Sequence, residues 1–129
     1  MMPGRLLQEE LTEVSPGVYE GEGWFYKRSD AHHRPFTGDA SLLELYVRAR
    51  DIGFYPPETR FSLEWDAIVM AIPALRLGNV QGRHVPKILA LADVVPPERM
   101  HGDVWTPQNY GFTDDGEVYY FDLELLKNR

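Results

Sequence analysis

The sequence predicts an α+β fold in a single domain of 129 residues. Apolar residues recur with helical spacing in two separate segments, and each pair of predicted strands is joined by a short turn. Strands that pair locally form antiparallel sheets, whereas a parallel sheet needs a crossover helix between neighbouring strands. The predicted order of elements is therefore strand–strand, helix, strand–strand, helix, strand–strand.

The N-terminal part contains the first predicted hairpin. Residues 5–14 (RLLQEELTEV) are predicted to form a short helix or a frayed lead-in. Aromatic and β-branched residues then flank the turn E-G-E-G, so Val18 and Tyr19 are expected to pair with residues 24–26. Residues 28–38 contain proline, glycine and two adjacent histidines, and this composition predicts a loop.

The first helix is predicted over residues 39–53 (DASLLELYVRARDIG). Asp39 or Ser41 can cap its start, and Gly53 is expected to end it. Its apolar stripe consists of Leu42, Leu45, Tyr46, Ala49 and Ile52. This i, i+3, i+4, i+7 spacing is typical of an amphipathic helix with one buried face.

The remaining elements follow the same reasoning. Residues 60–65 and 67–72 are predicted to form two strands. A second helix is predicted over about residues 85–94, and two consecutive prolines stop it. Two short strands, residues 110–113 and 118–121, are joined by Asp-Asp-Gly, in which Asp-Gly is a strong hairpin signal.

Charge and composition exclude several function classes. The formal net charge is -7, and the chain carries no long run of lysine or arginine. We therefore expect no nucleic-acid partner, because no basic stripe is available to neutralise a phosphate backbone. A nucleotide bound together with a divalent cation remains compatible with this charge, since the metal contributes positive charge of its own.

The chain contains no cysteine, which excludes disulfides, thiol catalysis and thiolate metal sites. The longest apolar run, residues 67–75, is interrupted by Pro73 and is too short to span a bilayer. The N-terminal stretch shows no signal peptide. We therefore expect a cytoplasmic protein without a membrane partner.

The segment HGDVWTPQNYGFTDDGEVYYFD, residues 101–122, carries the main functional signal. Asp103 and Asn109 precede the predicted hairpin and Asp122 follows it, so the hairpin brings Asn109 and Asp122 to the same end of two strands. Carboxylate and amide oxygens are the ligands that Mg²⁺ prefers. The segment resembles the catalytic segment of kinase-fold phosphotransferases, in the variant with glycine after histidine that is typical of aminoglycoside and choline phosphotransferases.

This resemblance implies a kinase-like fold with ATP and Mg²⁺ as cofactors. Residues 12–75 would form a small antiparallel N-lobe sheet with one helix, and residues 76–129 a reduced C-lobe with one helix and the catalytic hairpin. Asp103 would act on the acceptor hydroxyl. Asn109 and Asp122 would bind the Mg²⁺ ions that bridge the nucleotide phosphates. His101 would support the catalytic loop through packing and hydrogen bonds.

Residues upstream of this segment appear in the order that the resemblance requires. Lys27 matches the strand lysine that contacts the nucleotide phosphates, and Glu44 matches the helix glutamate that pairs with it. Met70 lies in the apolar strand that resembles the one leading to the adenine-binding hinge. Gly17, Gly21 and Gly23 lie where a phosphate-covering loop is expected, although their spacing does not fit G-x-G-x-x-G.

Two departures from the family pattern leave alternatives open. Five residues separate Asp103 from Asn109, whereas the family has four. Either the loop bulges, or Gln108 supplies the amide, or the site is degenerate. Few residues follow Asp122, so a small molecule or a protein partner is expected to complete the C-lobe. The alternative function is a catalytically degenerate, kinase-like module of regulatory, phage type that binds a nucleotide or a protein.

Each candidate residue also has a purely structural explanation. Asp103 can cap a turn, and Asn109 is a common turn residue. Lys27 can be a solvated strand end, and Glu44 can form a surface ion pair with Arg48 one helical turn later. If the motif match is accidental, the candidate residues lie far apart in space. The four histidines show no spacing typical of a zinc site.

Overall fold

The computed structural model describes residue 6 and residues 11–29, 40–64 and 67–127. The chain forms two compact units. The first comprises residues 1–47 and 58–74, and the second comprises residues 48–57 and 75–129. The second unit therefore includes residues 48–57, which the sequence analysis counted with the N-terminal part. No helix in the described ranges is long and apolar enough to cross a membrane.

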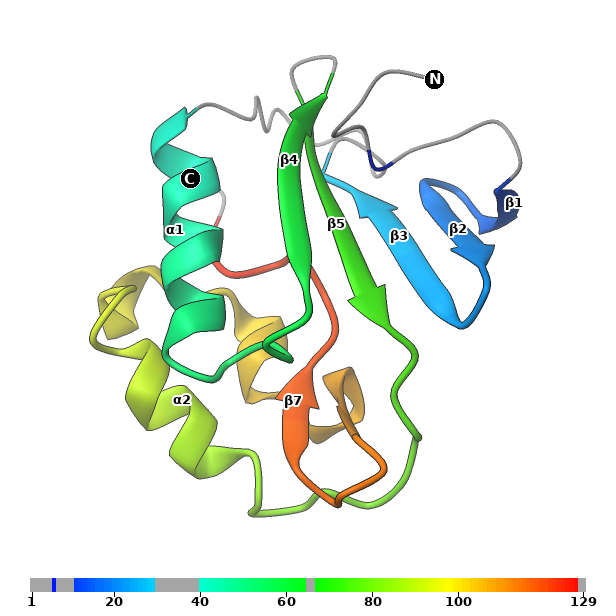
Figure 1. The fold of residues 1–129 in the computed structure, drawn as a ribbon. Coiled ribbons are helices and arrows are strands. Elements are labelled where there is room, and N and C mark those ends of the chain that lie inside the picture. Colours follow the sequence, from blue (N-terminus) through cyan, green and yellow to red (C-terminus); the bar gives the residue numbers. More distant parts are fainter. Residues whose placement is uncertain (1–5, 7–10, 30–39, 65–66, 128–129) are drawn as a thin grey trace. The chain divides into compact units, whose positions relative to one another are not determined.

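The first unit contains a five-stranded antiparallel sheet with the strand order β1-β2-β3-β5-β4 (Figure 1). Its strands are β1 (Thr12–Ser15), β2 (Val18–Gly21), β3 (Trp24–Arg28), β4 (Arg60–Glu64) and β5 (Ala67–Pro73). The predicted α+β class and the antiparallel pairing are confirmed. The prediction of a short helix or frayed lead-in over residues 5–14 was wrong at its end, because Thr12 and Val14 belong to an edge strand that pairs with β2. β-branched residues favour extended backbone.

The predicted hairpin between β2 and β3 is present in the expected register, with Tyr19 opposite Tyr26. Its two turn residues, Glu22 and Gly23, have φ angles of 54° and 82°. Two consecutive left-handed residues are typical of a type I′ turn, whose twist matches that of the strands. Arg28, predicted as the first residue of a loop, is the last residue of β3, and residues 30–38 of that loop lie outside the described ranges.

The central strand β5 is buried on both faces. Residues 67–72 are each at most 1% exposed, which explains the continuous apolar sequence of this strand. On one face, Val69 and Ala71 pack with Leu6, Trp24 and Tyr26. The opposite face carries Met70, whose register neighbours are Lys27 in β3 and Phe61 in β4.

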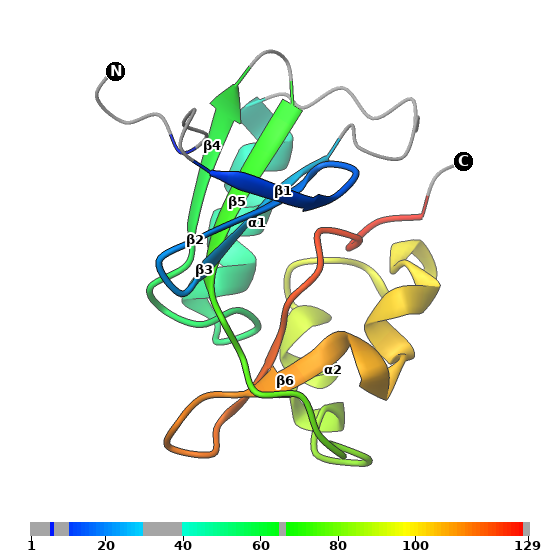
Figure 2. The same ribbon diagram turned by 90° about the vertical axis from the view of Figure 1, so that its right-hand side faces the viewer.

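Helix α1 (Ala40–Asp51) follows β3 in the chain and packs on the Met70 face of the sheet. The ring of Tyr46 stacks on that of Phe61 in β4, with a centroid distance of 5.3 Å. Figure 2 shows this helix behind strands β4 and β5. Gly53 ends the helix as predicted: its φ angle is 92°, and the amide of Phe54 donates to the carbonyl of Ala49.

The second unit contains helix α2 (Val85–Leu91) and a two-stranded sheet of β6 (Tyr110–Phe112) and β7 (Val118–Tyr120). The predicted helix over residues 85–94 is shorter than expected, because the amides of Val94 and Val95 both bond to the carbonyl of Leu91 and turn the chain. Three single-turn 3₁₀ helices were not predicted: η1 (Pro97–Arg99), η2 (Gly102–Trp105) and η3 (Pro107–Asn109).

An aromatic cluster forms part of the core of the second unit. It consists of Phe54, Tyr55, Tyr110 and Tyr120, each at most 1% exposed. The ring centroids of Phe54 and Tyr120 lie 4.9 Å apart, and those of Tyr110 and Tyr120 lie 5.1 Å apart. Such tilted aromatic pairs contribute favourable quadrupole interactions in addition to apolar burial. The cluster gives β6, β7 and the turn after α1 a common core.

Candidate functional site

Two consecutive 3₁₀ turns, η2 and η3, build the loop over residues 101–109. The amide of His101 donates to the carbonyl of Leu125 over 2.9 Å, which ties the start of the loop to the C-terminal segment. The Nδ1 atom of His101 in turn accepts a hydrogen bond from the amide of Asp103 over 3.0 Å. His101 therefore supports the loop through hydrogen bonds, as the sequence analysis expected.

The second turn accommodates the additional residue between Asp103 and Asn109. The Nδ2 atom of Asn109 donates to the backbone carbonyl of Asp103 over 3.1 Å. The amide of Thr106 donates to the same carbonyl over 3.1 Å, so this oxygen holds both turns together. Asn109 is half-buried, whereas Gln108 is exposed. Of the two amide side chains, Asn109 is the one that bonds to Asp103.

Asp122 follows the hairpin and lies in the same part of the second unit. The amide of Phe121 donates to the carbonyl of Asn109 over 3.2 Å, and Tyr110 pairs with Tyr120. The Oδ1 atom of Asp122 accepts a bond from the amide of Leu123 over 2.8 Å. The structure therefore brings together the segments that carry Asp103, Asn109 and Asp122.

Burial and nearby charges both act on the hydroxyl of Tyr120. Burial is the main cause that raises the pKa of Tyr120 above its ordinary value, and the charges of Asp122, Tyr110, Asp103 and Glu124 raise this pKa further. A nearby negative charge disfavours ionisation of an acidic group, and this effect weakens with distance. Three of these groups, Asp103, Asp122 and Glu124, belong to the loop and to the segment after β7.

Glu124 was not assigned a role from the sequence, although it follows Asp122 in a D-x-E pattern. Its carboxylate lies 3.9 Å from Nε2 of His101, and the carboxylate of Asp103 lies 3.7 Å from Nδ1 of the same ring. Both distances are longer than a hydrogen bond, and Nδ1 accepts its bond from the amide of Asp103. The imidazole of His101 therefore lies between the two carboxylates.

In the described part of the chain, no three histidine or acidic side chains are arranged to hold a metal ion by themselves. Mg²⁺ does not require such a set, because it keeps several water ligands and is usually held by one or two protein groups together with phosphate oxygens. The carboxylate of Asp122 and the Oδ1 atom of Asn109 are oxygen ligands of the kind that hold Mg²⁺ together with phosphate oxygens.

Lys27 belongs to the first unit, where it is half-buried on β3 opposite Met70 of β5. The side chain of Met70 is fully buried and packs within the sheet face that α1 covers. Lys27 also pairs with Val18 of β2, and the amide of Arg28 donates to the carbonyl of Gly17 over 3.0 Å. The turn beside Lys27 is thus the one between β1 and β2.

Two of the three glycines proposed for phosphate binding, Gly21 and Gly23, lie at the other end of these strands. Gly23 is four residues from Lys27 along the strand, which corresponds to about 13 Å. Its positive φ angle of 82° meets the geometric demand of the hairpin turn. A Cβ atom on Gly21 would lie 2.5 Å from Cδ2 at the end of the Leu11 side chain. Gly17 is the one of the three that lies in the turn beside Lys27.

Glu44 is exposed on α1. It is two residues from Tyr46, which faces the sheet, and two residues of an α-helix correspond to a rotation of about 200°. The side chain of Glu44 therefore leaves the helix on the side away from β4 and β5. This orientation gives no support to an ion pair with Lys27, which stays a prediction.

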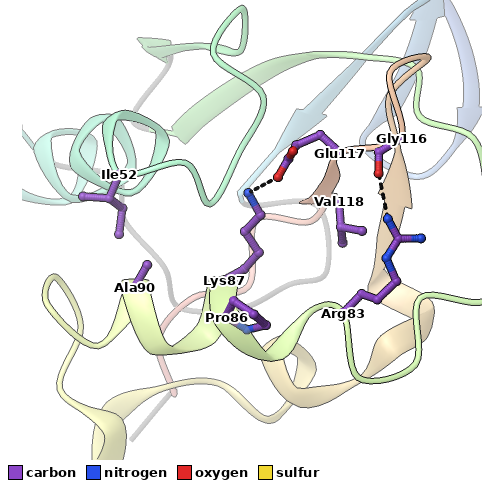
Figure 3. A pocket seen from close by; sticks show the side chains of 8 residues that line it. All are labelled: Ile52, Arg83, Pro86, Lys87, Ala90, Gly116, Glu117 and Val118. Carbon is purple, nitrogen blue, oxygen red and sulfur yellow. Dashed lines mark hydrogen bonds and ion pairs between the residues drawn. The ribbon is translucent and has the colours of Figure 1, made fainter.

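The second unit also contains a pocket of about 370 Å³ beside α2 and the β6–β7 hairpin (Figure 3). Two cationic side chains line it. Nη2 of Arg83 donates to the carbonyl of Gly116 over 2.9 Å. Nζ of Lys87 lies 3.2 Å from the carboxylate of Glu117 and 3.1 Å from the carbonyl of Gly53. These bonds join α2 and the turn before it to the hairpin. They indicate a structural role for Arg83 and Lys87.

Comparison with known proteins gave no match: no family model, no curated protein and no solved structure is significantly similar to this chain.

Proposed function

We propose that this protein is a kinase-like phosphotransferase that uses ATP and Mg²⁺ and acts on a hydroxyl group of a small molecule or a protein. The observation that carries the proposal is the hydrogen-bonded loop in which Asn109 bonds to Asp103 and the β6–β7 hairpin returns the chain to Asp122. Kinase-type phosphoryl transfer requires one acidic residue near the acceptor and an asparagine and an aspartate for the metal.

The roles follow from the chemistry of the side chains. Asp122 and Oδ1 of Asn109 would hold Mg²⁺, which neutralises charge on the phosphate oxygens when it is bound. Asp103 would orient the acceptor hydroxyl, and its side chain is 40% exposed and thus accessible to an acceptor. Lys27 would bind nucleotide phosphates beside the turn that contains Gly17, with Glu44 positioning it. Met70 is fully buried on the sheet face that α1 covers, so we assign it no contact with the nucleotide.

A second candidate function is a kinase-like module that binds a nucleotide or a protein without transferring phosphate. The exposed position of Glu44 favours it, because catalysis by this mechanism needs the lysine–glutamate pair to be in place. The additional residue between Asp103 and Asn109 also favours it. This candidate keeps the Mg²⁺–nucleotide site but predicts no turnover.

Thermal unfolding with and without ATP and Mg²⁺ tests the proposal. A ligand at about 100 times its dissociation constant stabilises the folded state by about 2.7 kcal/mol. We expect this Mg²⁺-dependent stabilisation in the wild type and its loss in Asp122→Asn. Asp114→Asn is the matched control, because the side chain of Asp114 is 95% exposed and forms only a surface pair with Arg76.

The outcomes separate the two candidates. If the wild type shows no stabilisation at millimolar ATP, the phosphotransferase proposal is wrong. If stabilisation occurs and depends on Asp122, but no ADP forms with water or any acceptor, the binding module is the correct function. Stabilisation together with ADP formation supports the phosphotransferase.

A further inference from the structure

The tyrosines of the aromatic cluster in the second unit have hydroxyl groups that need partners in the protein interior. The rings of Tyr55, Tyr110 and Tyr120 surround that of Phe54, with centroid distances of 5.5, 6.0 and 4.9 Å. A buried hydroxyl is almost always hydrogen-bonded. The three partners are all backbone carbonyls, and all of them lie in the segments that carry the acidic residues of the candidate site.

The first of these bonds fixes the catalytic loop. The hydroxyl of Tyr110 in β6 donates to the carbonyl of Val104 over 2.6 Å. Val104 directly follows Asp103 within η2, and its amide bonds to the carbonyl of His101. A short 3₁₀ turn is a weak structure when it stands alone. The bond from Tyr110 ties this turn to the rigid core of the unit.

The other two bonds fix the segment after β7. The hydroxyl of Tyr55 donates to the carbonyl of Asp122 over 2.6 Å. The hydroxyl of Tyr120 donates to the carbonyl of Glu124 over 2.8 Å. This segment forms no strand before Leu125, where backbone bonds and a β-bridge join it to residues 99–101. The two tyrosines thus set the backbone positions of both acidic residues relative to the aromatic core.

We propose that Tyr55, Tyr110 and Tyr120 are positioning residues, whose hydroxyls set the spacing of Asp103, Asp122 and Glu124. Apolar packing of the rings is not directional and would tolerate small shifts of these segments. A hydrogen bond fixes the distance and direction of each carbonyl. A cation site needs its ligands held to within about 0.5 Å, which makes the hydroxyls, and not the rings, the decisive groups. The consequence for cation binding rests on the function proposed above.

Amide hydrogen exchange without any ligand tests the positioning role directly. Tyr55→Phe and Tyr110→Phe remove one hydroxyl each and keep the ring. Tyr46→Phe is the matched control, because Tyr46 is equally buried but belongs to the first unit, where it stacks on Phe61. Amides of α2, which belongs to the same unit as the two variants, report changes in the stability of that unit as a whole.

We expect Tyr110→Phe to accelerate exchange at Val104 and Thr106 at least about tenfold more than at α2. Tyr55→Phe should act in the same way on residues 122–125, and the control should leave both segments unchanged. Equal acceleration at these segments and at α2 would overturn the proposal, because it would show only a general loss of stability of the second unit. If one variant does not fold, the other variant still tests the proposal, since the two hydrogen bonds fix different segments.

Equilibrium binding of Mn²⁺ with ATP is the second readout. We expect binding at least about tenfold weaker in Tyr55→Phe and Tyr110→Phe, and unchanged in Tyr46→Phe. If the wild type binds and both variants bind equally well, the positioning role is wrong although the proposed function stands. If the wild type does not bind, the proposed function fails, and hydrogen exchange alone decides whether the hydroxyls position the acidic segments.

Discussion

The side-chain amide of Asn109 donates a hydrogen bond to the backbone carbonyl of Asp103 over 3.1 Å. This bond closes the loop that contains both 3₁₀ turns and fixes the orientation of the amide group. Because the nitrogen is committed to Asp103, the oxygen Oδ1 is the atom that a cation would contact. One side chain can therefore hold this loop together and keep an oxygen available for the proposed Mg²⁺.

The first prediction concerns the identity of this amide. Asn109→Ala should weaken Mg²⁺-dependent ATP binding by at least about tenfold, because it removes both the ligand and the loop bond. Gln108→Ala should leave binding unchanged, since Gln108 is exposed. Calorimetric titration of both variants measures this difference. A loss of binding in Gln108→Ala but not in Asn109→Ala would identify Gln108 as the amide of the site.

The second prediction concerns two glycines near the site. A Cβ atom on Gly111 would lie 2.8 Å from the carbonyl oxygen of Arg76, which already accepts a bond from Phe112. Gly111→Ala should therefore destabilise the protein by about 1–3 kcal/mol. Gly102 has no atom within 4 Å of such a Cβ, so Gly102→Ala should change stability by less than about 0.5 kcal/mol. Urea denaturation measures both, and equal costs would contradict the packing described for β6.

The third prediction concerns Lys87, whose side chain is 18% exposed. Its Nζ atom bonds to Gly53 and Glu117 and lies 4.5 Å from the ring centroid of Tyr119. Lys87→Met keeps the apolar stem and removes these contacts, and we expect a loss of about 1–3 kcal/mol in unfolding free energy. Lys127→Met, at an exposed position, is the control and should cost little. Equal stability of the two variants would show that Lys87 does not join α2 to the hairpin.

The fourth prediction concerns alkaline pH. Burial raises the pKa of both Tyr110 and Tyr120 above the ordinary value of 10.0. The folded state therefore favours the protonated hydroxyls. The resulting stabilisation is fully present below pH 10 and is lost as the pH rises above the pKa of unfolded tyrosine.

Tyrosinate absorbance and circular dichroism, followed together with rising pH, measure this effect. Of the seven tyrosines, Tyr110 and Tyr120 should ionise only when the protein unfolds. In denaturant, all seven should titrate near their ordinary pKa. Ionisation of every tyrosine before any loss of the circular dichroism signal would contradict the burial of these two hydroxyls.

Local turn chemistry and apolar patterning were sufficient to predict most of the regular elements. Asp115-Gly116 and Glu22-Gly23 both mark hairpins, because their turns need residues that tolerate positive φ angles. The strand β1 was missed because RLLQEEL contains good helix formers and β1 is only four residues long. The turns η2 and η3 were missed because three or four residues are too few to show a period.

The candidate site was predictable in part. The types and order of Asp103, Asn109 and Asp122 carry the chemical signal, and the hairpin explains why they lie in one region. The glycine pattern alone could not distinguish the three assigned glycines, because only strand register shows that Gly17 lies beside Lys27 and Gly23 at the other end of the strand. The tyrosine bonds could not be predicted, because a contact such as that of Tyr55 with the carbonyl of Asp122 spans 67 residues and depends on the complete core.

The central claim is that Asn109 and Asp122 of the second unit bind Mg²⁺ together with ATP. Calorimetric titration of Mg²⁺–ATP into the wild type and Asp122→Asn tests it most directly, with Asp114→Asn as the matched control. We predict that the wild type and the control bind, and that Asp122→Asn binds at least about tenfold more weakly. Undiminished binding in Asp122→Asn, or no binding by the wild type, would contradict this claim.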